Sequence, residues 1–218
     1  MNRLNILKNK LYIKKRKKEK RRDKKSINQL IIDILSKSEK DNVIYDLGAN
    51  IGNYSLFFAE SDSEVRCYEP DLENYEILNF RSRNKKNIQT YNLACGTKNQ
   101  SLKLYKEKRD IFNFSTEGYS INTQGTNIDS ENFQIIQCID FCDELKSCTK
   151  KISLIKMDIE GAELEIIEKI IKENLHKLFG FLIVETHENL FPHSINRYKN
   201  LEKQIRLNGI KNINLNWH

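Results

Sequence analysis

The amino-acid sequence predicts an α/β fold with an open, twisted, mostly parallel β-sheet, helices on both faces and an antiparallel insertion. Strand-like apolar runs alternate with segments of helical periodicity along most of the chain. The first of these runs, residues 43–47, leads through a turn with two glycines into a helix-like segment over 55–60. The strand-like runs also end repeatedly in an acid or an amide, and open parallel sheets bind their ligands at that edge.

In the first half of the chain, strands and helices alternate as a parallel sheet requires. Apolar residues at helical spacing predict a helix over 26–37, ahead of the first strand. The second strand ends in Glu69 and is stopped by Pro70, and we expect Asp71 to cap the helix that follows. A third strand comes next, and residues 94–96 are expected to close it. The ranges predicted after the first helix are strands 43–47, 64–69 and 88–93 and helices 55–60 and 72–83.

Residues 97–150 interrupt this alternation. Period-two alternation at 101–106 and an apolar run at 133–140 predict two strands of an antiparallel insertion that replaces one crossover helix. The polar, hydroxyl-rich loop 113–127 between them has the length of a lid or a binding wall. The parallel pattern then resumes, with strand 152–157, helix 162–172, strand 180–185, helix 195–207 and a short strand within 213–217.

The length and composition favour a single globular domain. The chain has 218 residues, of which 39% are hydrophobic and 31% are charged, and this length suits one substantial domain better than two. Its apolar runs are far shorter than the roughly 18 residues of a membrane span, and polar residues interrupt the N-terminus too often for a signal peptide. Five cysteines without paired metal spacing fit reduced thiols in a core. We therefore predict a cytoplasmic protein.

The positive charge of the chain is concentrated at its N-terminus. Residues 1–25 hold thirteen lysines and arginines and two acids, which give this segment a net charge of +11. Because the whole chain has a net charge of +7, residues 26–218 carry −4. We divide the chain accordingly into a basic N-terminal arm, 1–25, and a single domain, 26–218. The arm is either a solvated terminus or a contact with an anionic surface, membrane headgroups or nucleic acid. A thin apolar side keeps open a peripheral attachment to a membrane.

The glycine turn after the first strand indicates the class of ligand. A dinucleotide fingerprint that starts at Gly48 needs glycine at positions 50 and 53, and both are asparagine here. The loop instead has the spacing D-x-G-x-N-x-G, from Asp46 through Gly48 and Asn50 to Gly52. This spacing suits a ligand without a pyrophosphate, such as S-adenosyl-L-methionine. Gly48 and Gly52 would let the backbone approach the methionine part of that cofactor, and Asp46 and Asn50 would bind its ammonium group or hold the loop.

The polar residues at the later strand ends complete the predicted site. Glu69 ends the second strand 23 residues after Asp46, where a carboxylate accepts hydrogen bonds from ribose hydroxyls. Asn92 and Ala94 are expected beside the adenine edge. The fourth and fifth strands end in two further pairs, Asp158 with Glu160 and Glu185 with His187.

These segments resemble the FkbM family of S-adenosylmethionine-dependent methyltransferases. The matching segments are D-L-G-A-N-I-G-N-Y, Y-E-P-D, N-L-A-C-G, I-D-F, L-I-K-M-D-I-E-G-A-E-L-E and I-V-E-T-H-E, in the order of the family and over about residues 40–190. The resemblance implies a class I methyltransferase (Rossmann-like) fold. It also implies O-methylation of a sugar, a glycan or a small-metabolite hydroxyl.

Methyl transfer to a hydroxyl requires that a proton leave the attacking oxygen, and the strand-end residues are candidates for this step. Either Asp158 or His187 is the general base, or these residues and Glu160 orient the acceptor. Asp158, Glu185 and His187 would also suit Mg²⁺, but clustered acids beside a cationic cofactor need no ion, so we predict no metal. Two other functions stay open: an RNA methyltransferase that uses the basic arm, and a non-catalytic module that binds the cofactor.

Overall fold

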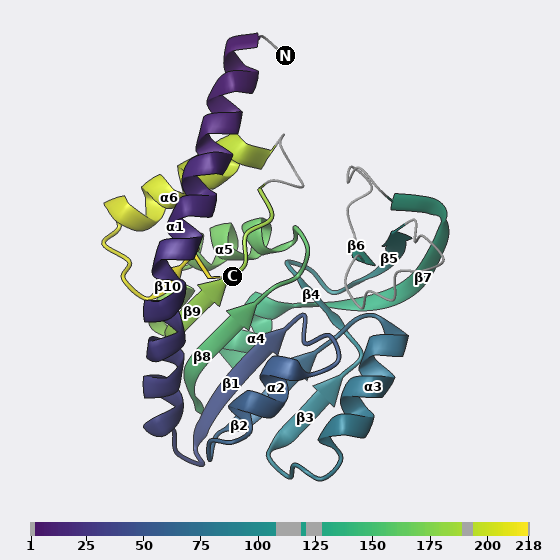
Figure 1. Cartoon of the computed structure of the whole chain (residues 1–218). Coiled ribbons are helices and arrows are strands. Elements are labelled where there is room, and N and C mark those ends of the chain that lie inside the picture. The colour runs from purple at the N-terminus through teal and green to yellow at the C-terminus, as the bar shows by residue number, and fades with distance from the viewer. Residues whose placement is uncertain (1–2, 108–118, 121–127, 189–193, 218) are drawn as a thin grey trace.

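A computed structural model describes residues 3–107, 119–120, 128–188 and 194–217. Its main sheet has the strand order β10-β9-β8-β1-β2-β3, and all neighbours in it are parallel (Figure 1). The chain builds outward from β1 to β3 and then returns to β8, on the other side of β1. The predicted fold class is therefore confirmed. The strands are β1 (Asn42–Leu47), β2 (Glu64–Tyr68), β3 (Ile88–Tyr91), β8 (Lys151–Met157), β9 (Phe179–Val184) and β10 (Ile213–Asn214).

Helices cover both faces of this sheet. Because successive side chains of a strand point to opposite faces, Ile44 and Tyr45 of β1 belong to two different apolar clusters. The Ile44 cluster packs against α2 (Asn53–Phe58) and α3 (Leu72–Ser82). The Tyr45 cluster packs against α4 (Phe141–Ser147), α5 (Glu163–Lys172) and α6 (Ile195–Leu207), with a short 3₁₀ turn at Leu175–Lys177. Asp71 caps α3 as predicted, accepting from the backbone N–H of Asn74.

The antiparallel insertion forms a second sheet in the order β4-β7-β5-β6. Its strands are β4 (Ala94–Gly96), β5 (Gln100–Glu107), β6 (Tyr119–Ser120) and β7 (Ile128–Asp140). The antiparallel pairing of β5 with β7 agrees with the two strands expected there. Most of the predicted loop 113–127 lies outside the described residues.

One expected boundary is wrong. Residues 94–96 do not close the third strand; they form β4, which pairs parallel with β7 in the second sheet. The third strand ends at Tyr91 because the amide of Asn92 donates to the backbone oxygens of Glu69 and Pro70, 2.9 and 3.0 Å away. These bonds turn the chain away from the main sheet.

The first helix is much longer than the sequence predicts. We expected a helix over 26–37, but α1 runs without a break from Arg3 to Ser36 beside the β10 edge of the sheet (Figure 1). Ile27 and Ile31 pack in the Ile44 cluster, whereas Tyr12 packs in the Tyr45 cluster. The division into an arm and a domain at residue 25 stays a prediction, and the helix backbone is continuous there. Among the described helices, none combines the length and the apolar character needed to cross a membrane.

Candidate active site

A cavity of about 270 Å³ opens at the carboxyl ends of the strands, beside the point where the chain order reverses between β1 and β8. Ligands of open α/β sheets bind at this switch point because the loops after neighbouring strands diverge there. Three predicted site residues lie behind its wall and do not line it: Asp46, Gly52 and Asn92. The other seven line it: Gly48, Asn50, Glu69, Ala94, Asp158, Glu160 and His187.

The loop after β1 lies directly against the loop after β8. Gly48 has a φ of 72°, and a Cβ atom built on it would lie 1.7 Å from the backbone oxygen of Asp158. Gly52 has a φ of 87°, and its Cβ would meet Leu78 at 2.6 Å. At position 48 a side chain would push apart two backbone segments of the cavity wall, and at position 52 it would meet the Leu78 side chain; both positive φ values favour glycine. Gly48 therefore shapes the ligand side of the loop, and Gly52 seats the start of α2 on α3.

Asp46 supports the loop from behind. Its buried carboxylate accepts from the Ser55 hydroxyl at 2.6 Å and lies 3.1 Å from the Lys156 ammonium group. Lys156 in turn donates to the backbone oxygen of Gly48 at 2.7 Å and lies 3.9 Å from Asp158. Of the two roles predicted for Asp46, this geometry favours holding the loop.

Lys156 was missed by the sequence analysis, although a charged residue inside the apolar run 152–157 was a visible signal. Burial opposes its charge, but the carboxylates of Asp46 and Asp158 outweigh that effect and raise the pKa of the ammonium group. A buried cation therefore links the two acidic strand ends.

Glu69 is directed at the glycine loop. One carboxylate oxygen accepts from the backbone N–H of Asn50 at 2.8 Å, and the other accepts from the N–H of Asp71 at 2.9 Å. Asn50 has a φ of 51°, so its N–H is presented by a left-handed backbone conformation. Burial raises the pKa of Glu69 to about 7, against the opposing effect of these two hydrogen bonds. Each carboxylate oxygen has a further lone pair to offer a ligand in the cavity.

Asn92 and Ala94 have different positions: Asn92 supports the cavity wall from behind, and Ala94 lines the cavity. The Asn92 amide is engaged with the two backbone oxygens that end β3, so its role in the structure is to shape the turn after Glu69. Ala94 lines the cavity beside Leu93 and Cys95, on an apolar wall.

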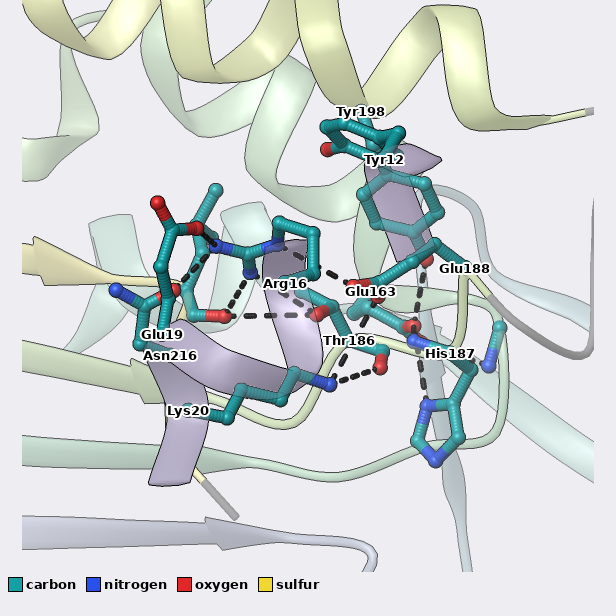
Figure 2. Close-up of polar contacts among 12 residues, drawn as sticks. Tyr12, Arg16, Glu19, Lys20, Glu163, Thr186, His187, Glu188, Tyr198 and Asn216 are labelled. Carbon is teal, nitrogen blue, oxygen red and sulfur yellow. Dashed lines mark hydrogen bonds and ion pairs between the residues drawn. The ribbon is translucent and has the colours of Figure 1, made fainter. Parts of the chain in front are cut away.

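His187, Asp158 and Glu160 converge on one side of the cavity. The Nε2 atom of His187 lies 3.6 Å from Asp158 and 3.5 Å from Glu160. Its Nδ1 lies 3.2 Å from Glu163 (Figure 2). Glu163 is fully buried and also accepts from the Tyr198 hydroxyl at 2.8 Å. This carboxylate fixes the imidazole with Nδ1 bonded to Glu163 and Nε2 facing the two acids. Glu163 belongs to the sequence segment I-K-M-D-I-E-G-A-E, but its task is visible only once His187 is placed beside it.

The charges of this cluster are strongly coupled. Burial lowers the pKa of His187, but the bond to Glu163 and the charges of Glu163, Glu160 and Asp158 outweigh it and raise the pKa to about 9. Burial raises the pKa of Glu160 to about 7, with His187 opposing and the neighbouring acids reinforcing the shift. The cluster therefore holds a protonated imidazole at neutral pH.

The same three residues have the composition of a small metal site. One donor atom from each of Asp158, Glu160 and His187 can be chosen so that all lie within 4.8 Å of one another. The set that the sequence suggested as suitable for Mg²⁺ had Glu185 in place of Glu160. Our expectation that no metal is needed stays a prediction.

Comparisons with known proteins identify the enzyme class. The sequence model of the "Methyltransferase FkbM domain" matches residues 46–204. The chain belongs to the FkbM methyltransferase family. A curated relative of this FkbM methyltransferase, the hexuronic acid methyltransferase AglP of Haloferax volcanii, is 27% identical over 179 residues, which cover 81% of this chain and 69% of that protein.

Membership of the family makes the cavity the candidate site of methyl transfer in this FkbM methyltransferase. The matched range contains all ten predicted site residues and begins at Asp46. It excludes the whole of α1, which runs from Arg3 to Ser36. The candidate active site and the basic helix are thus distinct parts of the chain that meet in the folded structure.

Proposed function

We propose that the protein is an S-adenosyl-L-methionine-dependent O-methyltransferase that acts on a hydroxyl of a sugar, a glycan or a small metabolite. The observation that carries this proposal is the meeting, in one cavity, of a glycine loop and Glu69 with the cluster of His187, Asp158 and Glu160. The first group suits a nucleoside cofactor, and the second suits the removal of a proton. The name of the AglP relative supports a sugar as the acceptor.

The residues on the cofactor side fit S-adenosylmethionine. The absence of a side chain at Gly48 lets the loop after β1 pack against the Asp158 backbone and present its own backbone to the cavity. The buried Glu69 carboxylate faces the cavity and can accept both ribose hydroxyls while keeping its bonds to Asn50 and Asp71. When bound, the cofactor supplies an electrophilic methyl group on a sulfonium. The acids Asp158 and Glu160 then offer a negative field to that cation.

On the acceptor side, we assign His187 as the general base. Its Nδ1 is engaged by Glu163, so Nε2 is the atom that can take a proton from a hydroxyl in the cavity. Asp158 and Glu160 flank Nε2 and can accept hydrogen bonds from the acceptor hydroxyl or its neighbour. Glu163 is a positioning residue that also stabilises the imidazolium once the proton has moved.

The pH profile of methyl transfer tests this assignment. Because the pKa of His187 is about 9, kcat/KM for the wild type should rise as pH increases from 7 to 9. His187→Gln should lose about 10²–10⁴-fold of the rate and this rise, with cofactor affinity retained. The assay uses labelled S-adenosylmethionine with acceptor pools of sugars, glycans and small metabolites.

Two controls make the result specific. His176→Gln, a histidine of the Leu175–Lys177 turn that does not line the cavity, should leave the rate and the profile unchanged. A total RNA pool is included, since labelled RNA would favour the alternative acceptor. The assignment would be wrong if the rate were flat between pH 7 and 9, or if it were intact in His187→Gln but lost in Asp158→Asn. Asp158 would then be the general base. Loss of activity with a chelator would show that the acid cluster works through a metal.

A further inference from the structure

A second cavity adjoins the candidate active site. It has a volume of about 470 Å³ and shares Glu185 and His187 with the first cavity. One wall is the segment 185–188 after β9, and the other is a side of α1. The helix residues on that wall are Ile13, Lys17, Lys20, Arg21 and Lys24. The methyl-transfer side of the molecule thus opens onto the basic helix.

A third cavity, of about 530 Å³, continues along the same helix. It shares Ile13, Lys17 and Arg21 with the second cavity and extends to Lys10. The two cavities form a path from His187 along α1. We call the positively charged side of this path the basic stripe, which consists of Lys10, Lys14, Lys17, Arg21 and Lys24.

The basic stripe is one face of a helix. Its members recur at steps of four, three, four and three residues, the spacing at which side chains of an α-helix lie one above the other. From Lys10 to Lys24 the stripe spans 14 residues, about 21 Å along the axis. Its side chains are exposed, and among the described residues Lys17, Arg21 and Lys24 form no ion pair. The stripe therefore presents positive charge to whatever fills the path.

One acid that lines the path, Glu188, is neutralised by residues outside the basic stripe. Glu188 is buried, 3.2 Å from the Arg16 guanidinium and 3.8 Å from the Lys20 ammonium group (Figure 2). Lys20 also donates to the backbone oxygen of Thr186 at 2.7 Å. Arg16 and Lys20 thus hold the wall of the cavity, and the stripe beside them stays available for a ligand.

We propose that the basic stripe binds an acidic saccharide, whose carboxylate or phosphate groups contact Lys17, Arg21 and Lys24 while its acceptor hydroxyl lies beside His187. This inference deepens the proposed function and rests on it. The path is concave, and its lining shares Glu185 and His187 with the candidate active site, as an acceptor site requires. Its length along α1 suits a chain of sugars. None of the described residues that line it is an aromatic on which bases would stack, which disfavours single-stranded RNA.

Direct binding tests the stripe without turnover. The probes are a glucuronic acid hexamer, a phosphorylated glucose hexamer and a neutral glucose hexamer, each measured by fluorescence anisotropy at low and high salt. The wild type should bind an acidic probe, more weakly at high salt, and should not bind the neutral one. The two acidic probes separate a carboxylate from a phosphate ligand. The triple variant Lys17→Ser, Arg21→Ser, Lys24→Ser should lose about tenfold or more in affinity, since exposed charge pairs contribute up to about fivefold each.

The helix provides a matched control. Lys8→Ser, Arg22→Ser and Lys15→Ser remove the same residue types from the opposite side of α1, outside both cavities. This triple variant should bind like the wild type, with equal helix content by circular dichroism. Equal losses in both variants would overturn the inference, because only bulk charge would then matter. Stripe-dependent binding that is tighter to phosphatidylglycerol vesicles or to polyuridylate than to either acidic hexamer would also overturn it.

Cofactor binding, measured separately by calorimetry, keeps the two proposals distinguishable. If the protein binds S-adenosylmethionine but shows no stripe-dependent saccharide binding, only this inference is overturned. If it shows stripe-dependent saccharide binding but does not bind the cofactor, only the proposed function is overturned. With an acidic acceptor that turns over, the stripe variant should raise KM and leave kcat unchanged, because the stripe does not touch the reacting atoms.

Discussion

At the scale of single residues, buried carboxylates determine what the cavity can bind. Glu69 and Glu163 are both buried, but their surroundings drive them in opposite directions. Burial dominates at Glu69 and raises its pKa to about 7, whereas the bonds from His187 and Tyr198 hold the pKa of Glu163 below its usual value. The Glu69 carboxyl therefore titrates near neutral pH, where ligand binding can change its protonation. Glu163 remains an anion that orients His187.

Cofactor affinity should consequently depend on pH through Glu69. The ionised carboxylate accepts ribose hydroxyls better than the protonated one, so S-adenosylmethionine should bind about tenfold more weakly at pH 6 than at pH 8. Glu69→Gln should lose about 10–100-fold in affinity at pH 8, because it removes charge-assisted hydrogen bonds. Calorimetry across this pH range measures both effects.

The matched control is Glu64→Gln, at the other end of β2, where the carboxylate pairs with Arg66 and Lys150 instead of facing the cavity. It should leave cofactor affinity and its pH dependence unchanged. Any pH dependence that survives in Glu69→Gln belongs to Glu160, whose pKa is also about 7. An unaltered profile in Glu69→Gln would contradict the role assigned to Glu69.

At the scale of elements, α1 is joined to the body by a buried polar contact. The Arg16 guanidinium lies 3.2 Å from Glu188 and also donates to Asn216 and to the backbone oxygen of Leu215. Both charged side chains are almost fully buried, so neither is solvated if the other is removed. The contact also lies next to His187, so the helix and the candidate active site share a support.

Removal of Arg16 should be far more costly than removal of an exposed lysine beside it. Arg16→Met should lower the free energy of unfolding by about 3–5 kcal/mol, because it leaves the Glu188 carboxylate buried with only Lys20 nearby. Urea unfolding measures the change. The control, Lys15→Met on the exposed side of the same helix, should change stability by no more than about 0.5 kcal/mol.

A double variant separates the ion pair from packing. Arg16→Met combined with Glu188→Leu should recover most of the lost stability, since no charge is then left unpaired in the interior. Additive losses in the double variant would mean that Arg16 stabilises the protein chiefly through its contacts with Asn216 and Leu215.

At the scale of the whole molecule, α1 contributes to the cores on both faces of the sheet. Tyr12 packs with the helices α4 to α6, and Ile27 and Ile31 pack with α2 and α3. One element therefore ties the two apolar layers together along the β10 edge (Figure 1).

A chain that begins at residue 26 tests whether the basic segment is a separate arm. We expect it to lose more stability than Arg16→Met does, because it lacks Tyr12 and Arg16 together and exposes Glu188. Its urea midpoint and m-value, compared with those of the full chain, measure this loss. A midpoint equal to that of the full chain would favour the division at residue 25 and would show that α1 adds little to folding.

Much of the fold could be predicted because it depends on local patterns. The strands β1 and β8 are apolar runs, and Asp71 and the glycines indicate where helices begin. Glu69 and Asp158, as acids at strand ends, indicate the position of the site. The pairing of residues 94–96 and the first part of α1, residues 3–25, could not be predicted in this way. The pairing partner of β4 is 44 residues away, and the helix 3–25 is stabilised by side chains from the far end of the chain.

The sequence by itself determined the sheet, the glycine loop and the acidic strand ends, since each follows from neighbours within about 20 residues. Only the tertiary structure decided which side chains face a ligand and which support the wall. Asp46 meets Lys156, Glu163 meets His187 across 24 positions, and Arg16 meets Glu188 across 172. Each of these contacts joins charges that are buried together, and a linear pattern does not record which buried charge will find which partner.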